Sequence, residues 1–162
     1  MRRKDREIQG IMDKVRIIEK CKYCRIGLSE NNYPYIVPLN YGYSYEKEKL
    51  TLFFHSAIEG KKIDIIKNNN KACFEIDYET KLIEGEKACN YGYEYRSIIG
   101  FGKIIFLETN EEKIEGLNKI MQHQTGEKNN YTFNENEVKN VLVFKMVVED
   151  FTGKERILKK NG

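Results

Sequence analysis

The sequence is poor in several residue types, and each shortage excludes a class of protein. It contains no tryptophan, two prolines and two histidines among 162 residues. Two histidines are too few for a typical histidine-rich metal site, and the H-E-x-x-H and G-x-S-x-G motifs are absent. We therefore expect no metal centre and no metalloprotease or serine hydrolase. Four cysteines with one C-x-x-C motif indicate neither a disulfide scaffold nor a complete zinc site.

Long hydrophobic runs are missing as well. No apolar stretch approaches the roughly 18 residues that a membrane span needs, and the N-terminus lacks the apolar core of a signal peptide. We therefore expect a cytoplasmic protein with no membrane partner. The net charge of +3 is too small to favour nucleic acid as a partner.

Positive charge is nevertheless concentrated in the first 25 residues, where nine Lys or Arg residues stand against four Asp or Glu. A basic arm of this kind could contact RNA, but a solvated amphipathic helix explains the same charges, and we favour it. We expect this helix over about residues 5–20, because apolar residues recur there with helical spacing, at Ile8, Ile11, Met12, Val15 and Ile18.

The rest of the composition predicts one globular, strand-rich domain over residues 1–162, with a short tail over about residues 152–162. Hydrophobic residues are 40% of the chain and charged residues 33%, which is typical of a folded domain. Eleven tyrosines and eight phenylalanines favour strands over helices. A chain of this length can bury a core without disulfides or metals.

Alternation of apolar residues predicts six strands, over about residues 23–28, 35–45, 50–55, 71–83, 96–107 and 141–149. Helices are expected over about residues 59–67 and from Thr109 onward, each opened by a capping box, Ser56 with Glu59 and Thr109 with Glu112. Residues 129–139 read as a polar loop. Mainly antiparallel connections with helices between them fit a mainly β fold, a small β-barrel with added helices.

The segment from Asn31 to Asp77 carries the main candidate site. Its order is strand, turn, strand, Gly60-Lys61-Lys62 at the mouth of a helix, then strand. This order places a helix N-terminus and two ammonium groups close to one another at the end of a strand, where an anion such as a nucleotide phosphate could bind. The alternative is two solvated surface lysines on the polar face of the helix.

Three other candidate side chains could have purely structural roles. His55 at a strand end could be a structural side chain, and Ser56 a capping residue. His123 near a helix C-terminus is explained by the helix dipole, which favours a protonated imidazole there.

The cysteine motif Cys21-x-x-Cys24 resembles half of a zinc or redox site, and both of these readings stay open beside a structural one. Cys73 lies in an apolar strand, and we expect it to point into the core.

Three stretches taken together carry a family resemblance. They are PYIVPLNYGY, LFFHSAIEGKKIDIIKNN and YRSIIGFGK, in this order along the chain. The sequence, from about Met1 to Phe151, resembles the nitroimidazole-resistance (Nim) proteins of the pyridoxamine 5'-phosphate oxidase-like, FMN-binding split β-barrels. The resemblance implies a six-stranded antiparallel Greek-key split barrel that binds FMN as a homodimer.

The resemblance also implies site residues. Ser56, Ala57, Lys61 and Lys62 would meet the FMN phosphate and its neighbouring ribityl chain, with His55 beside the cofactor as the candidate proton source. Further contacts are implied for Val37, Pro38, Leu39 and Asn40 along the flavin, for Ser97, and for His123, whose helix end could approach the flavin of a partner subunit. Arg96 could pair with phosphate, although members of the family vary at this position.

The function implied is a flavin-dependent reductase of small electrophiles such as nitroimidazoles, with a nicotinamide nucleotide as the electron donor. The alternative is a flavin- or haem-binding split-barrel module without turnover. Pyridoxamine phosphate oxidation itself is not expected, because the C-terminal TGKERILKKNG shows no counterpart of the basic substrate-binding residues of those oxidases.

Overall fold

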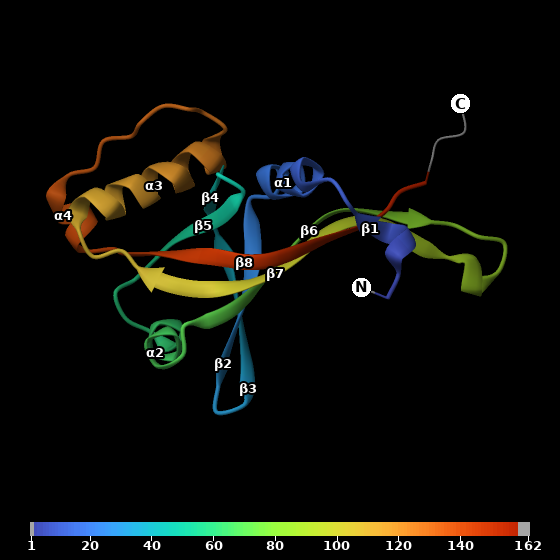
Figure 1. Ribbon diagram of the computed structural model, residues 1–162, viewed down its shortest axis with the longest axis horizontal. Coiled ribbons are helices and arrows are strands. Elements are labelled where there is room, and N and C mark those ends of the chain that lie inside the picture. The colour runs from blue at the N-terminus through green and yellow to red at the C-terminus, as the bar shows by residue number, and fades with distance from the viewer. Residues whose placement is uncertain (1, 159–162) are drawn as a thin grey trace.

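The computed structural model describes residues 2–158, apart from the side chains of residues 79 and 80 (Figure 1). Within this part, eight strands form one antiparallel sheet in the order β3-β2-β6-β7-β8-β5-β4, with β1 paired to β8. The strands are β1 (Glu7–Ile8), β2 (Tyr23–Glu30), β3 (Tyr33–Asn40), β4 (Gly42–Glu46), β5 (Lys49–Ser56), β6 (Lys71–Ile83), β7 (Gly92–Phe106) and β8 (Leu142–Arg156).

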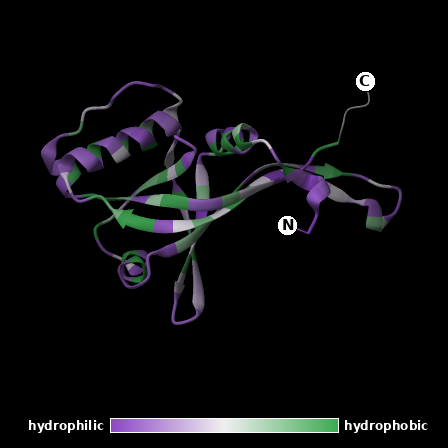
Figure 2. Ribbon diagram, in the orientation of Figure 1, coloured by the Kyte–Doolittle hydropathy of each residue, from purple (hydrophilic) through white to green (hydrophobic). Residues whose placement is uncertain are grey.

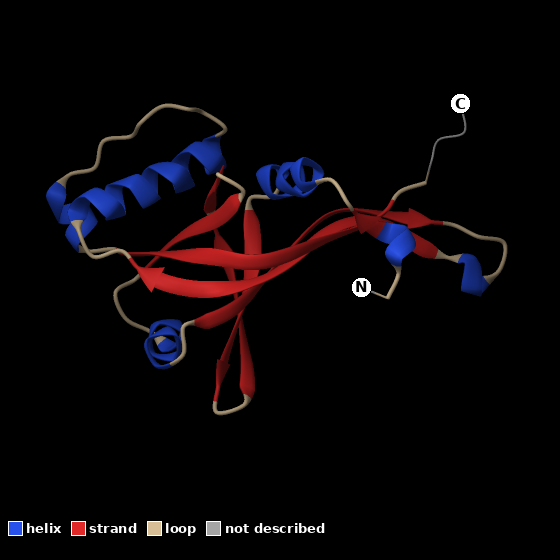
Figure 3. Ribbon diagram, in the orientation of Figure 1, coloured by secondary structure: helices blue, strands red, loops and turns tan. Residues whose placement is uncertain are grey.

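Four α-helices and two short 3-10 turns accompany the sheet. They are α1 (Ile11–Lys20), α2 (Lys61–Asn68), α3 (Asn110–Thr125) and α4 (Glu135–Lys139), with 3-10 turns at Lys4–Arg6 and Ala88–Asn90. Figure 3 shows β7 and β8 running the length of the molecule, with α3 and α4 near one end and a thin arm of β1, β6, β7 and β8 at the other. No helix in the described part is long and apolar enough to cross a bilayer.

The core lies on the inner face of the curled sheet, because alternate residues of each strand point there. Phe54 on β5 and Phe144 on β8 are fully buried and stacked, with ring centroids 5.3 Å apart. A second, smaller cluster under α3 contains Phe53, Leu107, Ile120 and Val143. Figure 2 shows hydrophobic residues on the last part of β7 and the first part of β8, whereas hydrophilic residues cover much of α3. The antiparallel, mainly β architecture expected from the sequence is confirmed.

The expected strand over residues 35–45 is wrong, because the chain breaks there into β3 and β4, which stand at opposite edges of the strand order. Tyr41 lies at the break. It is fully buried, and its hydroxyl donates a hydrogen bond to the Ile18 carbonyl oxygen of α1 at 2.6 Å. Apolar alternation alone cannot reveal this tertiary contact. The hairpin of β4 and β5 is present as expected.

Other element boundaries also differ from those expected. The N-terminal helix begins at Ile11 rather than near residue 5, because Glu7–Ile8 instead pairs with β8 as β1. The expected polar loop over residues 129–139 contains α4, opened by a capping box between Asn134 and Glu137. The final strand continues through the expected tail as far as Arg156, and residues 159–162 of that tail lie outside the described residues.

The cysteines Cys21 and Cys24 are buried and free. Burial raises the pKa of Cys21 to about 11 and raises that of Cys24 further still. Thiolates are therefore disfavoured at both positions, which counts against redox chemistry. Among the described residues, no group of three or more His, Cys, Asp or Glu side chains is placed to hold a metal ion. Cys73 was expected in the core and is instead half-buried on the outer face, beside Gly27.

Candidate functional site

Helix α2 begins at Lys61 without a side-chain cap. Its N-cap residue is Gly60, whose φ of 130° lies in a region that other residues rarely adopt. The expected capping box of Ser56 and Glu59 is wrong, because the Ser56 hydroxyl instead donates to the Ala57 carbonyl oxygen at 2.7 Å. By contrast, α3 and α4 both carry full capping boxes. The Ile63 and Asp64 amides donate to the Gly60 carbonyl oxygen at 2.8 and 3.3 Å, so the amides left for another acceptor, such as an anion, are those of Lys61 and Lys62.

The two lysines that open α2 are held differently. The Lys61 Nζ lies 3.7 Å from the Glu30 Oε2 at the end of β2 and 5.1 Å from the centre of the Tyr35 ring on β3. Lys62 is half-buried. The side chain of Lys61 is 60% exposed, so its ion pair with Glu30 is weak and exchangeable. These contacts place the start of α2 against the β2–β3 hairpin.

The residues at the end of β5 alternate between the two faces of the sheet. Ser56 is buried, whereas His55 and Ala57 are exposed. Since the Ser56 proton is committed to the Ala57 carbonyl, this hydroxyl is better placed to accept a hydrogen bond than to donate one. His55 lies opposite Val143 in the β5–β8 ladder.

Strand β3 forms one edge of the sheet within the described chain. An edge position suits Pro38, since a proline cannot donate to a ladder. Val37 and Leu39 are half-buried, and Pro38 and Asn40 are exposed. The Asn40 amide donates to the Lys22 carbonyl oxygen and to the Gln124 side chain, each at 3.2 Å. The first part of β3 therefore lies near Lys61, and its last residue is tied to the end of α3.

His123 is buried inside its own chain. Its Nδ1 lies 2.7 Å from the Tyr41 carbonyl oxygen and its Nε2 lies 3.0 Å from the Glu19 carbonyl oxygen. Its own carbonyl oxygen accepts a hydrogen bond from the Lys22 Nζ. A neutral imidazole has one N–H and so donates to one of these two carbonyl oxygens, and the ring lies between α1 and the β3–β4 break and joins α3 to both. The structure gives His123 a structural role, and we leave it out of the proposed flavin contacts.

Burial lowers the pKa of His123, and the two carbonyl oxygens oppose that effect only in part. The unfolded chain therefore binds this proton more readily than the folded chain. We expect the free energy of unfolding to fall as the pH drops below about 6.5 and through the lower pKa of the folded state, by about 1.4 kcal/mol for each pH unit that separates the two pKa values.

Urea denaturation of the wild type and of His123→Gln, from about pH 5 to pH 8, measures this effect. The variant should be less stable at neutral pH and should show a flatter profile on the acid side. Identical acid slopes in the two proteins would show that His123 does not carry the dependence.

Ser97 lies far from the other candidates in a single chain. It is half-buried on β7, in register with Asp77 on β6 and Lys154 on β8. The opposite end of β7, Phe106, pairs with Phe144, which in turn pairs with Phe54 just before His55. Nine residues of strand separate Ser97 from Phe106, or about 30 Å at about 3.3 Å per residue. One chain therefore does not bring Ser97 to the start of α2. Arg96 beside it pairs with Glu155 at 3.1 Å.

Comparison with known proteins identifies the family of the chain. A family model described as pyridoxamine 5'-phosphate oxidase matches residues 13–155. A structure from Bacteroides thetaiotaomicron, provisionally assigned as a 5-nitroimidazole antibiotic resistance protein, is 33% identical, with a TM-score of 0.80 over 92% of this chain and 86% of the other. The chain belongs to the pyridoxamine 5'-phosphate oxidase family. Curated proteins give no significant match.

Two more distant structures share the fold of this family. The FAD and heme binding protein from Mycobacterium smegmatis is 12% identical, with a TM-score of 0.80 over 97% of this chain and 76% of the other. A FAD-binding protein from Mesorhizobium loti is 18% identical, with a TM-score of 0.67 over 94% of this chain and 98% of the other. The predicted split barrel and the predicted resemblance to nitroimidazole-resistance proteins are both confirmed.

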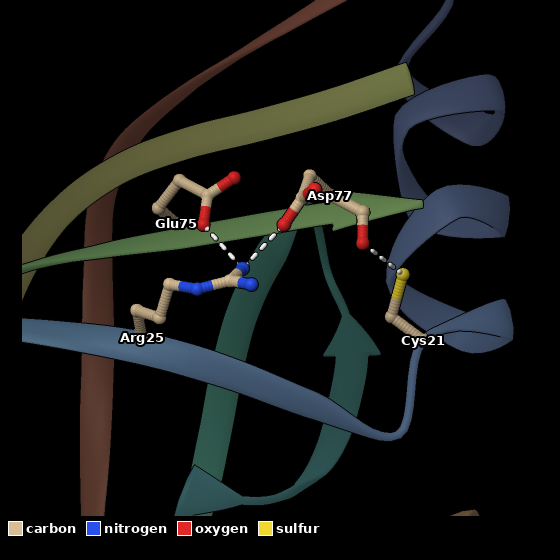
Figure 4. A network of polar contacts seen from close by, with 4 residues as sticks. All are labelled: Cys21, Arg25, Glu75 and Asp77. Atoms are coloured by element: carbon tan, nitrogen blue, oxygen red, sulfur yellow. Dashed lines mark hydrogen bonds and ion pairs between the residues drawn. The ribbon is translucent and has the colours of Figure 1, made fainter. Parts of the chain in front are cut away.

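This member of the pyridoxamine 5'-phosphate oxidase family also carries a charged cluster that sequence reasoning missed. Figure 4 shows the Arg25 guanidinium of β2 between the carboxylates of Glu75 and Asp77 on β6. The Arg25 Nη1 lies 2.9 Å from the Glu75 Oε2 and also pairs with the Asp77 carboxylate. The backbone carbonyl oxygen of Asp77 accepts a hydrogen bond from the Cys21 thiol. Burial, followed by the charge of Asp77, raises the pKa of Glu75. The spacing of Glu75 and Asp77, two residues apart on one strand face, was the available signal.

Proposed function

We propose that the protein binds FMN and uses it to reduce small electrophilic compounds, with nitroimidazoles as the substrate class. The observation that carries the proposal is the uncapped start of α2, where the backbone amides and the ammonium groups of Lys61 and Lys62 lie beside the edge strand β3. A terminal phosphate fits this charge and these donors. The provisional assignment of the 33% identical relative to nitroimidazole resistance supports the substrate class.

The residues present fit the parts of FMN as follows. Lys61, Lys62 and the first amides of α2 would hold the phosphate, and Ser56 would accept a hydrogen bond from a ribityl hydroxyl. Backbone groups of Val37 to Asn40 on the open edge of β3 offer donors and acceptors for the polar rim of the ring. These assignments favour FMN over riboflavin, which has no phosphate to occupy the start of α2.

When bound, FMN supplies electron transfer from a nicotinamide nucleotide to the substrate. The chain itself would orient both molecules and would hold a proton close to the substrate. His55 is the candidate proton donor, because its imidazole is exposed at the end of β5, a few residues before α2.

The proposed unit is a homodimer with two equivalent sites. The argument is that the candidate residues are divided in one chain, since Ser97 lies about 30 Å along the sheet from the end that carries His55. A two-fold partner can bring a second copy of Ser97 to that end. Side chains fill the interior of this barrel, so the ring must bind in an outer cleft that a second subunit can cover.

The test begins with the absorption spectrum of the purified protein, followed by chromatography of the released chromophore and anaerobic addition of NADH or NADPH. We expect bound FMN that is bleached by the nucleotide and recovers its colour when a nitroimidazole is added. Flavin that binds but is not reduced would indicate a module without turnover. Haem as the only chromophore, or no flavin uptake on titration with FMN, would end the flavin proposal.

A further inference from the structure

A polar cleft of about 410 Å³ lies between α2 and the tip of the β2–β3 hairpin. Residues 29–32 of the hairpin form one wall, and Ile65, Asn68 and Asn69 at the far end of α2 form the other. Figure 1 shows α2 and this hairpin on the same side of the molecule. Sites for small molecules usually enclose about 300–1,000 Å³. This space, called here the hairpin cleft, is therefore large enough for a small molecule such as a nucleoside.

Amide side chains line the hairpin cleft, and most of them are uncommitted. The side-chain amides of Asn31, Asn32 and Asn68 form no hydrogen bond within the described part of the chain, whereas that of Asn69 donates to the Ser29 carbonyl oxygen at 3.4 Å. Asn31 and Asn32 also have a backbone reason to stand at the turn, since their φ values of 49° and 66° are ones that asparagine tolerates. Asn68 has no such reason. Its amide offers a donor and an acceptor side by side, the pair that recognises the edge of an adenine base.

Glu30 lies where the hairpin cleft meets the start of α2. Its carboxylate lines the cleft and stands 3.7 Å from the Lys61 Nζ, so the cleft opens directly beside the proposed phosphate site. The Glu30 side chain is 38% exposed, which leaves its oxygens accessible to a ligand. A carboxylate in such a place accepts hydrogen bonds from the hydroxyls of a ribose, and it repels a phosphate group on the same ribose.

The register of β3 sets the order of these parts along one line. Glu30 pairs with Tyr33, the first residue of β3, and the Tyr35 ring lies 5.1 Å from the Lys61 Nζ. The edge proposed to meet the flavin ring, Val37 to Asn40, follows on the same strand. From Tyr33 to Val37 the strand advances by about 13 Å. The hairpin cleft, the phosphate site and the flavin edge therefore follow one another along β3, and a dinucleotide is long enough to extend over all three.

Resting on the proposed function, we propose that the hairpin cleft binds the adenosine half of the nicotinamide nucleotide that reduces the flavin, with Glu30 on the ribose and Asn68 on the adenine. The nucleotide then lies along FMN, with its nicotinamide at the ring and its adenosine beyond the phosphate. The ammonium groups of Lys61 and Lys62 offset the repulsion between the phosphates that meet there. Because NADPH carries a phosphate on the 2′-oxygen of this ribose, Glu30 makes NADH the preferred donor.

Donor selectivity tests the role of Glu30. Anaerobic reduction of the FMN-loaded protein is followed at the flavin absorption band over a range of NADH and NADPH concentrations. We expect the wild type to be half-saturated by NADH at about one-tenth of the NADPH concentration or less. Glu30→Gln should lose most of this difference, and Glu30→Lys should reverse it, because an ammonium group then faces the 2′-phosphate. Glu48→Gln, at the exposed turn between β4 and β5, is the matched control and should keep the wild-type ratio. Equal use of the two nucleotides by the wild type, or an unchanged ratio in Glu30→Lys, would overturn the assignment.

A binding measurement separates the hairpin cleft from the proposed function. Calorimetric titration with ADP-ribose, which lacks the nicotinamide, needs no turnover and is done on flavin-loaded and flavin-free protein. We expect Asn68→Ala to weaken ADP-ribose binding by about tenfold or more. Asn136→Ala, the same change at an exposed position on α4, is the control and should have no effect.

The outcomes of the titration distinguish the two proposals. ADP-ribose binding that depends on Asn68, in a protein that takes up no flavin, would refute the flavin proposal and support the cleft. Flavin that is reduced by NADH, in a protein whose Asn68→Ala variant binds ADP-ribose like the wild type, would refute the cleft and leave the flavin proposal intact. FAD as the released flavin would also refute it, because the adenosine of that flavin would occupy the cleft.

Discussion

Replacement of Gly42 by alanine is expected to lower the free energy of unfolding by about 3 kcal/mol, the upper end of the usual cost of overpacking a core. Gly42 is the first residue of β4 and is buried. An ideal Cβ at this position would fall within 3.0 Å of backbone atoms of Lys119 and Ile120 in α3. Backbone cannot rotate away as a side chain can, so α3 would have to move outward.

That movement is costly because α3 is fixed on its buried side. Ile120 packs into the cluster with Phe53, and His123 bridges two carbonyl oxygens of other elements. Displacement of the helix would disturb these contacts together. Urea denaturation with a two-state fit measures the effect.

Gly10→Ala is the matched control. Its Cβ would also come within 3.0 Å of a neighbour, but that neighbour is the carboxylate of Asp13, the far end of an exposed side chain that can turn aside. A loss of about 1 kcal/mol or less is expected, because Gly10 is the N-cap of α1 and alanine caps a helix less well than glycine. A loss in Gly42→Ala no greater than the capping loss in Gly10→Ala would show that the close approach of β4 to α3 has no special cost.

Gly42 also shows why part of the fold could not be predicted from sequence. Apolar alternation continues smoothly from Tyr35 to Tyr45, so it indicates one strand. The break into β3 and β4 depends on the burial of Tyr41 against α1 and on the contact of Gly42 with α3, both of which join residues distant in sequence. Strand β6 has no such interruption, and it was predicted with its observed bounds.

Of the two capping boxes predicted from sequence, one is present in the structure and the other is not. Thr109 and Glu112 form the predicted capping box, because both partners are local and nothing competes for them. Ser56 and Glu59 have the same spacing, but Gly60 at a positive φ separates the serine from α2, and the hydroxyl turns to Ala57 instead. A local motif therefore predicts a cap only where the backbone between its members is helical.

Sequence motifs named the candidate site residues but could not predict how these residues lie relative to one another. The sequence motifs pointed to Lys61, Lys62 and the stretch around Pro38, and the structure places the start of α2 against the first part of β3, which carries Pro38. The burial of His123 and the distance of Ser97 follow from helix docking and sheet register, which a list of motifs does not contain. The cluster of Arg25 with Glu75 joins strands that are distant in sequence but adjacent in the sheet.

Loss of either lysine at the start of α2 is expected to weaken FMN binding by about tenfold to a hundredfold, the equivalent of one charge-assisted contact of ~1.5–3 kcal/mol. Lys61→Ala and Lys62→Ala should each weaken binding, and the double variant should weaken it most. The fold should be unaffected, because Lys61 is exposed and its ion pair with Glu30 is worth little. Titration of the apoprotein with FMN, followed by flavin fluorescence, gives the dissociation constants.

Two further variants separate a phosphate contact from a general loss of positive charge. Lys67→Ala removes an exposed lysine from the last turn of the same helix, where the helix dipole repels an anion, and should leave FMN affinity unchanged. Glu30→Gln releases Lys61 from its carboxylate partner and should keep or improve affinity. If Lys67→Ala weakens FMN binding as much as the double variant does, only the overall charge matters. If the double variant binds like the wild type, these are solvated surface lysines, and the phosphate must bind elsewhere.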